Sequence, residues 1–243
     1  MMKKIFARIW ALWGLVIFIA TLLIFVWPIA LSFFIKDPRG FMVFKNTSKL
    51  WMTIYLYAIG CPMRIKGKQH YDSSKQYVVT ANHSSFLDVP LLTPFFPGPN
   101  KTIAKKSMSR IPLFGWVYTR GSVLVDRKSD ASRKRSFDDM RKVLQHEKLN
   151  MAVYPEGTRN RTGQPLKSFY DGAFKLAVDT QKDIIPVVIR NTAKALPPSQ
   201  FFYLLPVPLE MELLPAIPVA GKTADALKAE VFDIMWKAVA ANA

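Results

Sequence analysis

The hydrophobic pattern divides the chain into an apolar amino-terminal part and a longer part of mixed pattern. No charged residue occurs from Ile9 to Ile35, a run longer than the roughly 20 residues that a helix needs to cross a bilayer. Pro28 should kink or end a helix near Trp27. A second uncharged stretch, Leu50–Met63, is too short to cross and is expected to lie in the interface or to form the second arm of a hairpin. We therefore expect a membrane-anchoring segment over residues 1–63, either a span or a re-entrant hairpin.

The apolar run is also longer than the apolar part of a signal peptide, which has about 7–15 residues before a cleavage site. Tryptophans, whose rings favour the membrane interface, lie near both ends of the run, at Trp10, Trp13 and Trp27. Three cations precede the run and four follow it: Lys3, Lys4 and Arg8, then Lys36, Arg39, Lys45 and Lys49. We expect an uncleaved anchor whose carboxyl-terminal side faces the cytoplasm, because cytoplasmic flanks carry more positive charge.

Beyond Arg64, short runs typical of strands alternate with amphipathic helical patterns. Strands are predicted over Gln76–Ala81, Gly121–Val125, Met151–Tyr154, Ile184–Arg190 and Leu209–Leu214, from their apolar and β-branched residues. Helices are predicted over Ser132–Gln145, Asp171–Thr180 and Lys222–Ala240, from apolar residues at helical spacing. This alternation is typical of an α/β fold. It predicts a layered mixed sheet flanked by helices, forming one domain over residues 64–243.

Composition narrows the class of partner. The formal net charge is +17, an excess that favours an anionic partner such as phospholipid headgroups, nucleic acid or a phosphorylated small molecule. More than half of the excess lies between residues 101 and 167. Cys61 is the single cysteine, which excludes an intramolecular disulfide framework and a thiolate zinc cluster.

His83 is the histidine whose position suggests chemistry, because it follows a predicted buried strand directly. Ligands of open α/β sheets bind at the carboxyl ends of strands. Asp88 lies five residues later, which on one helix would place the two side chains about 140° apart. They meet if His83 lies in the loop and a helix begins after it, with Ser85 as its N-cap. Asp88 would then orient His83 as a general base, although Ser85 and Asp88 also fit a simple capping box.

A second polar segment, residues 154–161, follows the predicted strand that ends at Tyr154. Pro155 and Gly157 are typical of a tight turn. Four side chains are then expected to project at the same sheet edge: Glu156, Thr158, Arg159 and Arg161. Guanidinium groups match phosphate oxygens in a bidentate way, so this segment is either an anion site or a charged surface turn.

Two further cations lie beside predicted strands. Arg127 ends the segment Gly121–Arg127, and Lys105 follows the short apolar patch Thr102–Ala104. Taken alone, each is typical of a solvated surface residue.

Together these segments resemble a known family. The sequence NHSSFLD, which contains His83 and Asp88, is similar to the H-x4-D motif of the 1-acylglycerol-3-phosphate acyltransferase (lysophosphatidic acid acyltransferase) family of the glycerolipid acyltransferase superfamily. The segments GSVLVDR, YPEGTRNRTG and IIPVVI resemble its second, third and fourth motifs, in the family's order over Val78–Ile189.

The resemblance implies transfer of a fatty acyl group from acyl-CoA or acyl-carrier protein to the 2-hydroxyl of lysophosphatidic acid, giving phosphatidic acid. It assigns His83 as general base and Asp88 as its orienting partner. It implies that Glu156, Gly157, Thr158 and Arg159 bind the acceptor and that Arg127 and Lys105 contact the acceptor's phosphate. It implies no metal or organic cofactor, contact with anionic membrane lipids and no nucleic-acid partner. It also implies a bacterial cytoplasmic membrane, with the acyltransferase domain over residues 64–243 on the cytoplasmic side.

Two departures from the family pattern leave the acceptor open. Tyr170-Asp171 stands where the family often has Phe-Lys, and Ser107-Met108 where it often has Glu-Leu. An acyltransferase for another lysolipid is therefore the first alternative. A basic membrane-tethered module that binds anionic lipid or nucleic acid is the second, although its cations would alternate with aromatic residues. The basic stretch Arg133–Lys142 contains only Phe137.

Overall fold

One mixed sheet organises the chain, for which a computed structural model describes residues 1–126 and 128–241. Within these residues seven strands pair in the order β1-β7-β6-β2-β5-β3-β4. Their bounds are β1 Met63–Lys66, β2 Val78–Ala81, β3 Asn100–Lys105, β4 Ser122–Val125, β5 Asn150–Val153, β6 Ile184–Arg190 and β7 Leu209–Leu213. β6 and β7 are antiparallel, and the other neighbouring strands are parallel. The predicted layered mixed sheet is confirmed.

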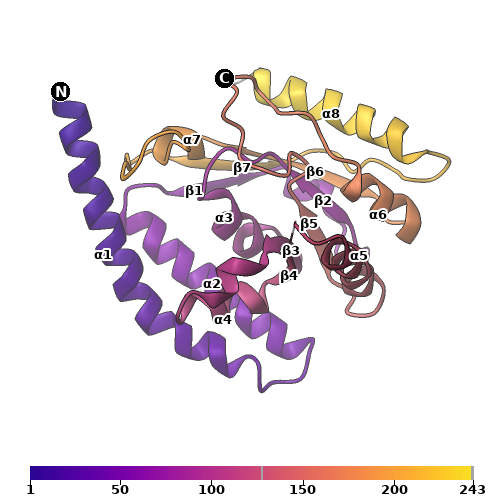
Figure 1. The fold of residues 1–243 in the computed structure, drawn as a ribbon, viewed down its shortest axis with the longest axis horizontal. Coiled ribbons are helices and arrows are strands. Elements are labelled where there is room, and N and C mark those ends of the chain that lie inside the picture. Colours follow the sequence, from indigo (N-terminus) through magenta and orange to yellow (C-terminus); the bar gives the residue numbers. More distant parts are fainter. Residues whose placement is uncertain (127, 242–243) are drawn as a thin grey trace.

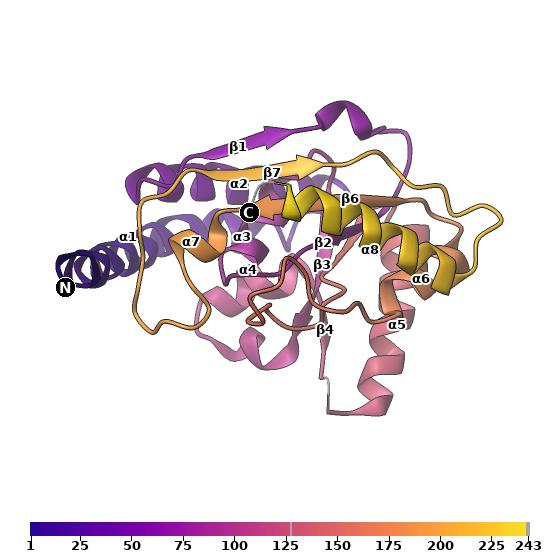
Figure 2. The ribbon, with the colours of Figure 1, turned by 90° about the horizontal axis from the view of Figure 1, so that it is seen from above.

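Helices cover both faces of the sheet (Figures 1 and 2). The helices are α1 Met2–Leu31, α2 Arg39–Ala58, α3 Asp88–Phe95, α4 Phe114–Arg120, α5 Asp130–Gln145, α6 Gly172–Thr180, α7 Thr192–Ala195 and α8 Ala224–Ala240, with 3-10 turns η1 Lys68–His70 and η2 Lys106–Arg110. Helices α5, α6 and α8 pack on one another and on β2, β4, β5 and β6. Helices α3 and α4 pack on β3 and β4 from the other side, with α1 and α2 outside them. The sheet therefore lies between two sets of helices, with α5, α6 and α8 on one face and α1 to α4 on the other.

The five predicted strands correspond to β2, β4, β5, β6 and β7, and the three predicted helices correspond to α5, α6 and α8. Strands β1 and β3 were not predicted. Strands β2, β5 and the first six residues of β6 are wholly buried, as continuous apolar runs in parallel sheets should be. Strand β1 alternates between half-buried and exposed positions, and β3 ends in an exposed Lys105. Their charged residues conceal the strand pattern, so β1 and β3 are absent from the prediction.

Helices α1 and α2 form an antiparallel hairpin. Indole nitrogens of α1 donate to carbonyls at the end of α2: Trp10 Nε1 to Ile59 and Trp13 Nε1 to Ala58, each at 3.0 Å. Further along the pair, Trp51 Nε1 donates to Thr21 Oγ1 at 2.9 Å. The predicted hairpin arm Leu50–Met63 is thus the last part of a longer helix, α2, and the turn that follows it.

Pro28 does not end α1 near Trp27, as the sequence suggested. The helix continues to Leu31, and the Ser32 amide still donates to the Pro28 carbonyl at 3.2 Å. Proline removes one backbone donor, and its effect is greatest within a helix that has no other support. Here Val26 and Ile29 are fully buried, so packing on both sides of Pro28 holds the last turn.

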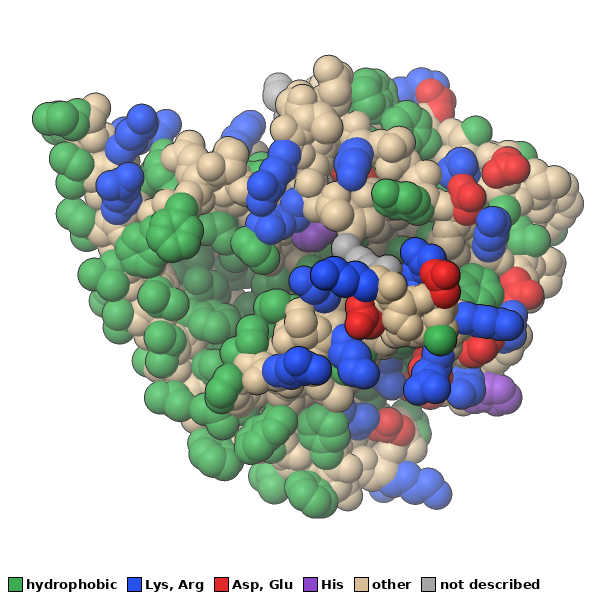
Figure 3. Space-filling model, in the orientation of Figure 1, with side chains coloured by type: hydrophobic (Ala, Val, Ile, Leu, Met, Phe, Trp, Pro, Cys, Tyr) green, Lys and Arg blue, Asp and Glu red, His purple; other side chains and the backbone are tan. Residues whose placement is uncertain are grey.

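The opposite side of α1 is apolar and exposed. The exposed large side chains include Ile5, Phe6, Ile9, Leu12, Val16, Ile19, Leu23, Ile24, Trp27 and Leu31. Figure 3 shows apolar side chains gathered along the edge that α1 forms, with the cations concentrated elsewhere. By length and composition α1 could cross a bilayer. A continuous apolar surface of this kind marks a membrane or protein contact.

We expect Trp51→Ala to loosen the packing of α2 on α1. Trp51 is 2% exposed and its ring lies against Phe18 and Phe25, so truncation leaves a cavity and costs about 3–5 kcal/mol of unfolding free energy. Thermal unfolding in detergent measures this loss. Trp236→Ala, at a half-buried position on α8, is the control, and an equal or larger loss there would contradict the expectation.

Candidate active site

Parallel pairing brings the ends of several strands to one edge of the sheet. Strand β2 lies between β5 and β6 and is parallel to both, so the residues after these three strands are neighbours. His83 follows β2, Tyr154 follows β5, and Thr192 follows β6. Lys105 ends β3 at the same edge, because β3 is parallel to β5. The candidate site is therefore assembled by topology rather than by proximity along the chain.

The structure brings His83 and Asp88 together. Nδ1 of His83 lies 2.8 Å from Oδ2 of Asp88. The His83 side chain is 16% exposed, whereas that of Asp88 is fully buried. The same carboxylate accepts from the Ser84 and Ser85 amides, each at 2.7 Å, and from Thr192 Oγ1 at 2.6 Å. A carboxylate held by four donors fixes the ring of His83 and leaves Nε2 as the nitrogen available to a substrate.

The predicted N-cap at Ser85 is wrong. Helix α3 begins at Asp88, and no side chain caps it. Ser85 Oγ instead donates to the Leu196 carbonyl at 2.8 Å. Because the Asp88 carboxylate takes the Ser84 and Ser85 amides itself, the segment Ser84–Leu87 forms a turn before the helix. His83 consequently lies outside the helix, the condition that allows its ring to reach Asp88.

Glu156 also differs from its predicted place. Its carboxylate is fully buried instead of projecting toward an acceptor. Oε1 accepts from the His83 amide at 2.7 Å and Oε2 from the Lys167 amide at 3.1 Å. Burial raises the pKa of Glu156 to about 7, against the opposing effect of these two amides. Glu156 therefore holds the backbone of His83 and does not project from the loop.

The remainder of the 154–161 loop faces the open side of His83. The Gly157 backbone has a φ of +70°, and a Cβ there would lie 2.7 Å from the Tyr170 ring, so this turn requires glycine. Arg159 places its guanidinium 3.5 Å from the centre of the Phe86 ring, a cation–π contact that holds the cation in place. Thr158 Oγ1 accepts from Lys167 Nζ at 2.9 Å.

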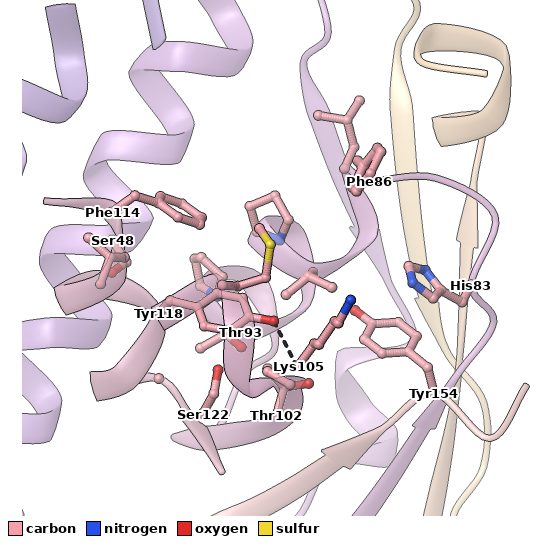
Figure 4. A pocket seen from close by; sticks show the side chains of 18 of the residues that line it. Ser48, His83, Phe86, Thr93, Thr102, Lys105, Phe114, Tyr118, Ser122 and Tyr154 are labelled. Atoms are coloured by element: carbon pink, nitrogen blue, oxygen red, sulfur yellow. Dashed lines mark hydrogen bonds between the residues drawn. The ribbon is translucent and has the colours of Figure 1, made fainter. Parts of the chain in front are cut away.

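A cavity of about 780 Å³ extends from His83 to the α1–α2 hairpin. At one end it is lined by His83, Gly157, Thr158, Arg159, Arg161 and Lys105. At the other end it is lined by apolar side chains of four helices, among them Phe18, Phe44, Trp51, Met52, Tyr55, Phe114 and Val117. Figure 4 shows His83, Tyr154 and Lys105 around one side of this space and Phe114 and Ser48 across it. The cavity thus joins a polar, cationic end to a long apolar end.

Most of the predicted site residues converge on this cavity. His83, Gly157, Thr158, Arg159 and Lys105 line it, and Asp88 supports His83 from behind. Arg127 lies outside the described residues.

Sequence reasoning missed Thr192 and Tyr154 as members of the site. Thr192 follows β6 at the same sheet edge where His83 follows β2. Because ligands bind at the carboxyl ends of strands, this position indicates Thr192 as it indicated His83. Tyr154 was included in the 154–161 segment, but its side chain was given no role. A hydroxyl group at the carboxyl end of a buried strand could have indicated that Tyr154 belongs to the site.

Comparison with known proteins identifies the family. Residues 62–190, more than half of the chain, match the family model described as Acyltransferase. The chain belongs to the acyltransferase family. Its sequence is 32% identical over 157 residues to the 1-acyl-sn-glycerol-3-phosphate acyltransferase of Saccharomyces cerevisiae, covering 63% of this chain and 50% of that protein. The resemblance drawn from the four motifs is thereby confirmed.

Two further acyltransferases show how far the similarity extends. The human 1-acyl-sn-glycerol-3-phosphate acyltransferase alpha is 31% identical over 178 residues, covering 70% of this chain and 59% of that protein. The chain thus spans about half to three fifths of the curated relatives it matches. The crystal structure of the 1-acyl-sn-glycerophosphate (LPA) acyltransferase PlsC from Thermotoga maritima superposes with a TM-score of 0.85 at 20% identity, covering 98% of this chain and 97% of that one. The fold, including the amino-terminal helix, is shared.

Stability should fall as the pH rises through the titration of Glu156. Its pKa in the folded protein, about 7, is above the ordinary value of 4.5. Folding therefore favours the protonated form, and this stabilisation is complete below about 4.5 and is lost as the pH rises through about 7. We expect Glu156→Gln to remove this component of the pH dependence.

Thermal unfolding from about pH 5 to about pH 8 measures the difference between variant and wild type. Glu230→Gln, on the partly exposed surface of α8, is the control for loss of one carboxylate. A Glu156→Gln profile with the same slope as the wild type would contradict the assignment.

Proposed function

We propose that this protein transfers a fatty acyl group from acyl-CoA or acyl-carrier protein to the 2-hydroxyl of 1-acylglycerol-3-phosphate, forming phosphatidic acid. The observation that carries the proposal is the His83–Asp88 pair at the cationic end of a long apolar cavity. Curated relatives that carry this activity by name support the choice of acceptor.

In this reaction His83 is the general base. Its Nε2 takes the proton of the acceptor hydroxyl as that oxygen attacks the thioester carbon, and Asp88 stabilises the imidazolium that forms. The thioester is already activated, so a base aligned with the acceptor and donors for the developing negative charge are sufficient. His83 then returns the proton to the leaving thiolate.

The acceptor's phosphate is assigned to the cations at the polar end of the cavity. Arg159 has a bidentate fork suited to phosphate, and Lys105 adds a second positive charge from β3. Burial lowers the pKa of Arg159 below its ordinary value, but a guanidinium remains charged at neutral pH. Thr158 and Gly157 complete this end. An acyl chain occupies the apolar end.

Of the departures from the family pattern, the one at Asp171 affects packing within the fold. Asp171 is bound by Lys228 Nζ at 2.6 Å and so faces α8, away from the cavity. Tyr170 instead packs against Gly157, and Met108 lines the cavity. Acceptor preference should therefore depend on Tyr170 and Met108.

For the membrane, we propose that the α1–α2 hairpin lies in one leaflet and that the acyltransferase domain, residues 64–243, remains on the cytoplasmic side of a bacterial inner membrane. Contacts along most of α1 support this: Leu204 donates to the Ala7 carbonyl at 3.1 Å, Trp51 to Thr21, and Val26 and Ile29 are buried. A helix packed on its own protein over this length has only its outer face available to lipid. The cytoplasmic side is proposed because it is where the proposed acyl donors are available.

Substitution of the proposed base tests the chemistry. We expect His83→Ala to lower kcat for acyl transfer to 1-acylglycerol-3-phosphate by about 10²–10⁴-fold, the usual contribution of a general base. Asp88→Asn should also lower kcat, because the imidazolium loses its stabilising charge. The assay follows thiol release with purified protein and both kinds of donor.

His146→Ala is the matched control, since His146 is exposed at the end of α5. Full activity in His83→Ala would reject the base assignment. Transfer by the wild type to another lysolipid only would retain the mechanism and change the acceptor.

Arg159 tests the phosphate assignment. We expect Arg159→Ala to raise KM for 1-acylglycerol-3-phosphate by about 10–100-fold, because a charge-assisted contact is worth about 1.5–3 kcal/mol, with a smaller effect on kcat. Arg141→Ala, which removes an exposed guanidinium on α5, should leave KM unchanged. An unaltered KM in Arg159→Ala would place the phosphate elsewhere.

The exposed face of α1 tests the membrane assignment. Ile9 and Ile24 are 63% and 65% exposed, so Ile9→Glu with Ile24→Glu should weaken sedimentation with anionic phospholipid vesicles without unfolding the protein. Gln145→Glu with Gln181→Glu adds the same charge at exposed positions on the opposite side. Equal vesicle binding by both pairs would contradict a role for this face.

A further inference from the structure

The Tyr154 hydroxyl is a buried polar group that the fold does not use. Tyr154 is 8% exposed, and its ring lies against that of His83 with centroids 4.5 Å apart and planes inclined by 34°. Within the described residues its hydroxyl has no hydrogen-bond partner. Leaving a buried hydroxyl unpaired is costly, and most such groups in proteins find a partner. The partner is therefore expected among molecules that enter the site.

Tyr154 lines the cavity in which acyl transfer is proposed to occur, together with His83 and Lys105. Its hydroxyl oxygen is buried in the wall of this cavity. Figure 4 shows the phenol directed away from its own strand and toward the side chain of Lys105. Burial, assisted by the charge of Asp88, raises the pKa of Tyr154 well above its ordinary value of 10.0. At neutral pH the phenol therefore keeps its proton and serves as a donor.

We propose that the Tyr154 hydroxyl donates a hydrogen bond to the thioester carbonyl oxygen and to the oxyanion that this oxygen becomes. The inference rests on the proposed function. Its basis is the contact between the His83 and Tyr154 rings. Because the two rings pack on each other, the base and the donor occupy one rigid arrangement at the reacting atoms. A donor held in place before the reaction is most effective on charge that develops in the transition state.

Acyl transfer proceeds through a tetrahedral intermediate. The acceptor's 2-hydroxyl oxygen forms a bond to the thioester carbon while its proton passes to Nε2 of His83. The carbonyl π electrons move to oxygen, and the O–H of Tyr154 donates to that oxyanion. When the intermediate collapses, the C–O double bond reforms, the C–S bond breaks, and the thiolate takes the proton from His83. The products are the ester and the free thiol, and Tyr154 is unchanged.

Tyr154→Phe tests this role, because it removes the hydroxyl and keeps the ring that stacks on His83. We expect kcat to fall by about 100-fold, as for loss of one oxyanion donor, with KM for donor and acceptor within about twofold, the pattern of an interaction made only in the transition state. We expect the Tm to be equal to or above that of the wild type, because an unpaired buried hydroxyl is removed. Tyr77→Phe is the matched control: this buried ring lies at the opposite end of β2, packed on Tyr71, and its kcat should be unchanged.

Three results would overturn the inference. Unchanged kcat in Tyr154→Phe would reduce Tyr154 to a support for the His83 ring. A raised acceptor KM with unchanged kcat would place the hydroxyl on the acceptor in the ground state. A lowered Tm would show that the hydroxyl has a partner in the free protein.

The same experiment separates this inference from the proposed function. Each variant is compared with the wild type on the lysolipid that the wild type acylates. Transfer by the wild type to a lysolipid other than 1-acylglycerol-3-phosphate rejects the proposed acceptor, while the kcat ratio of Tyr154→Phe still decides the role of Tyr154. Absence of transfer to any lysolipid would reject both.

Discussion

Much of the site depends on the burial of one carboxylate. Asp88 is completely inaccessible to solvent and is bound by two amides, an imidazole and a hydroxyl. These donors come from the loop after β2 and from Thr192 at the end of β6, so the charge joins the ends of two neighbouring strands. A buried charge without such partners would destabilise the fold strongly. The requirement to satisfy Asp88 therefore determines the path of the backbone around His83.

Glu156 supplies a second connection of the same kind. It accepts from the His83 amide, and the Asn160 amide donates to the His83 carbonyl at 2.7 Å. Both backbone polar groups of His83 are thus held by the loop after β5, a segment more than 70 residues away in sequence. His83 and Arg159 consequently belong to one rigid unit.

The sequence predicts the parts of this arrangement that follow from strand burial and topology. The apolar strands β2, β5 and β6 identify the sheet, and the polar residues that follow them identify its functional edge. The half-buried strands β1 and β3 are hidden because Arg64, Lys66 and Lys105 interrupt their pattern. The role of Glu156 could not be predicted from its own segment, because its partner is the His83 amide, which lies in the loop after β2. Ser85 resembles a helix cap, but helix α3 begins three residues later, at Asp88, whose carboxylate accepts from the Ser84 and Ser85 amides.

The cavity gives the amino-terminal hairpin a second significance. Its apolar wall includes Phe18 of α1 and Trp51 and Tyr55 of α2, whereas its polar end is built from β2, β3 and the loop after β5. A boundary near residue 63 divides the sequence but not this compartment. Truncation of residues 1–63, a common route to a soluble fragment, would remove one wall of this cavity and open it to water. For this protein, solubility and an intact cavity are competing demands on the same two helices.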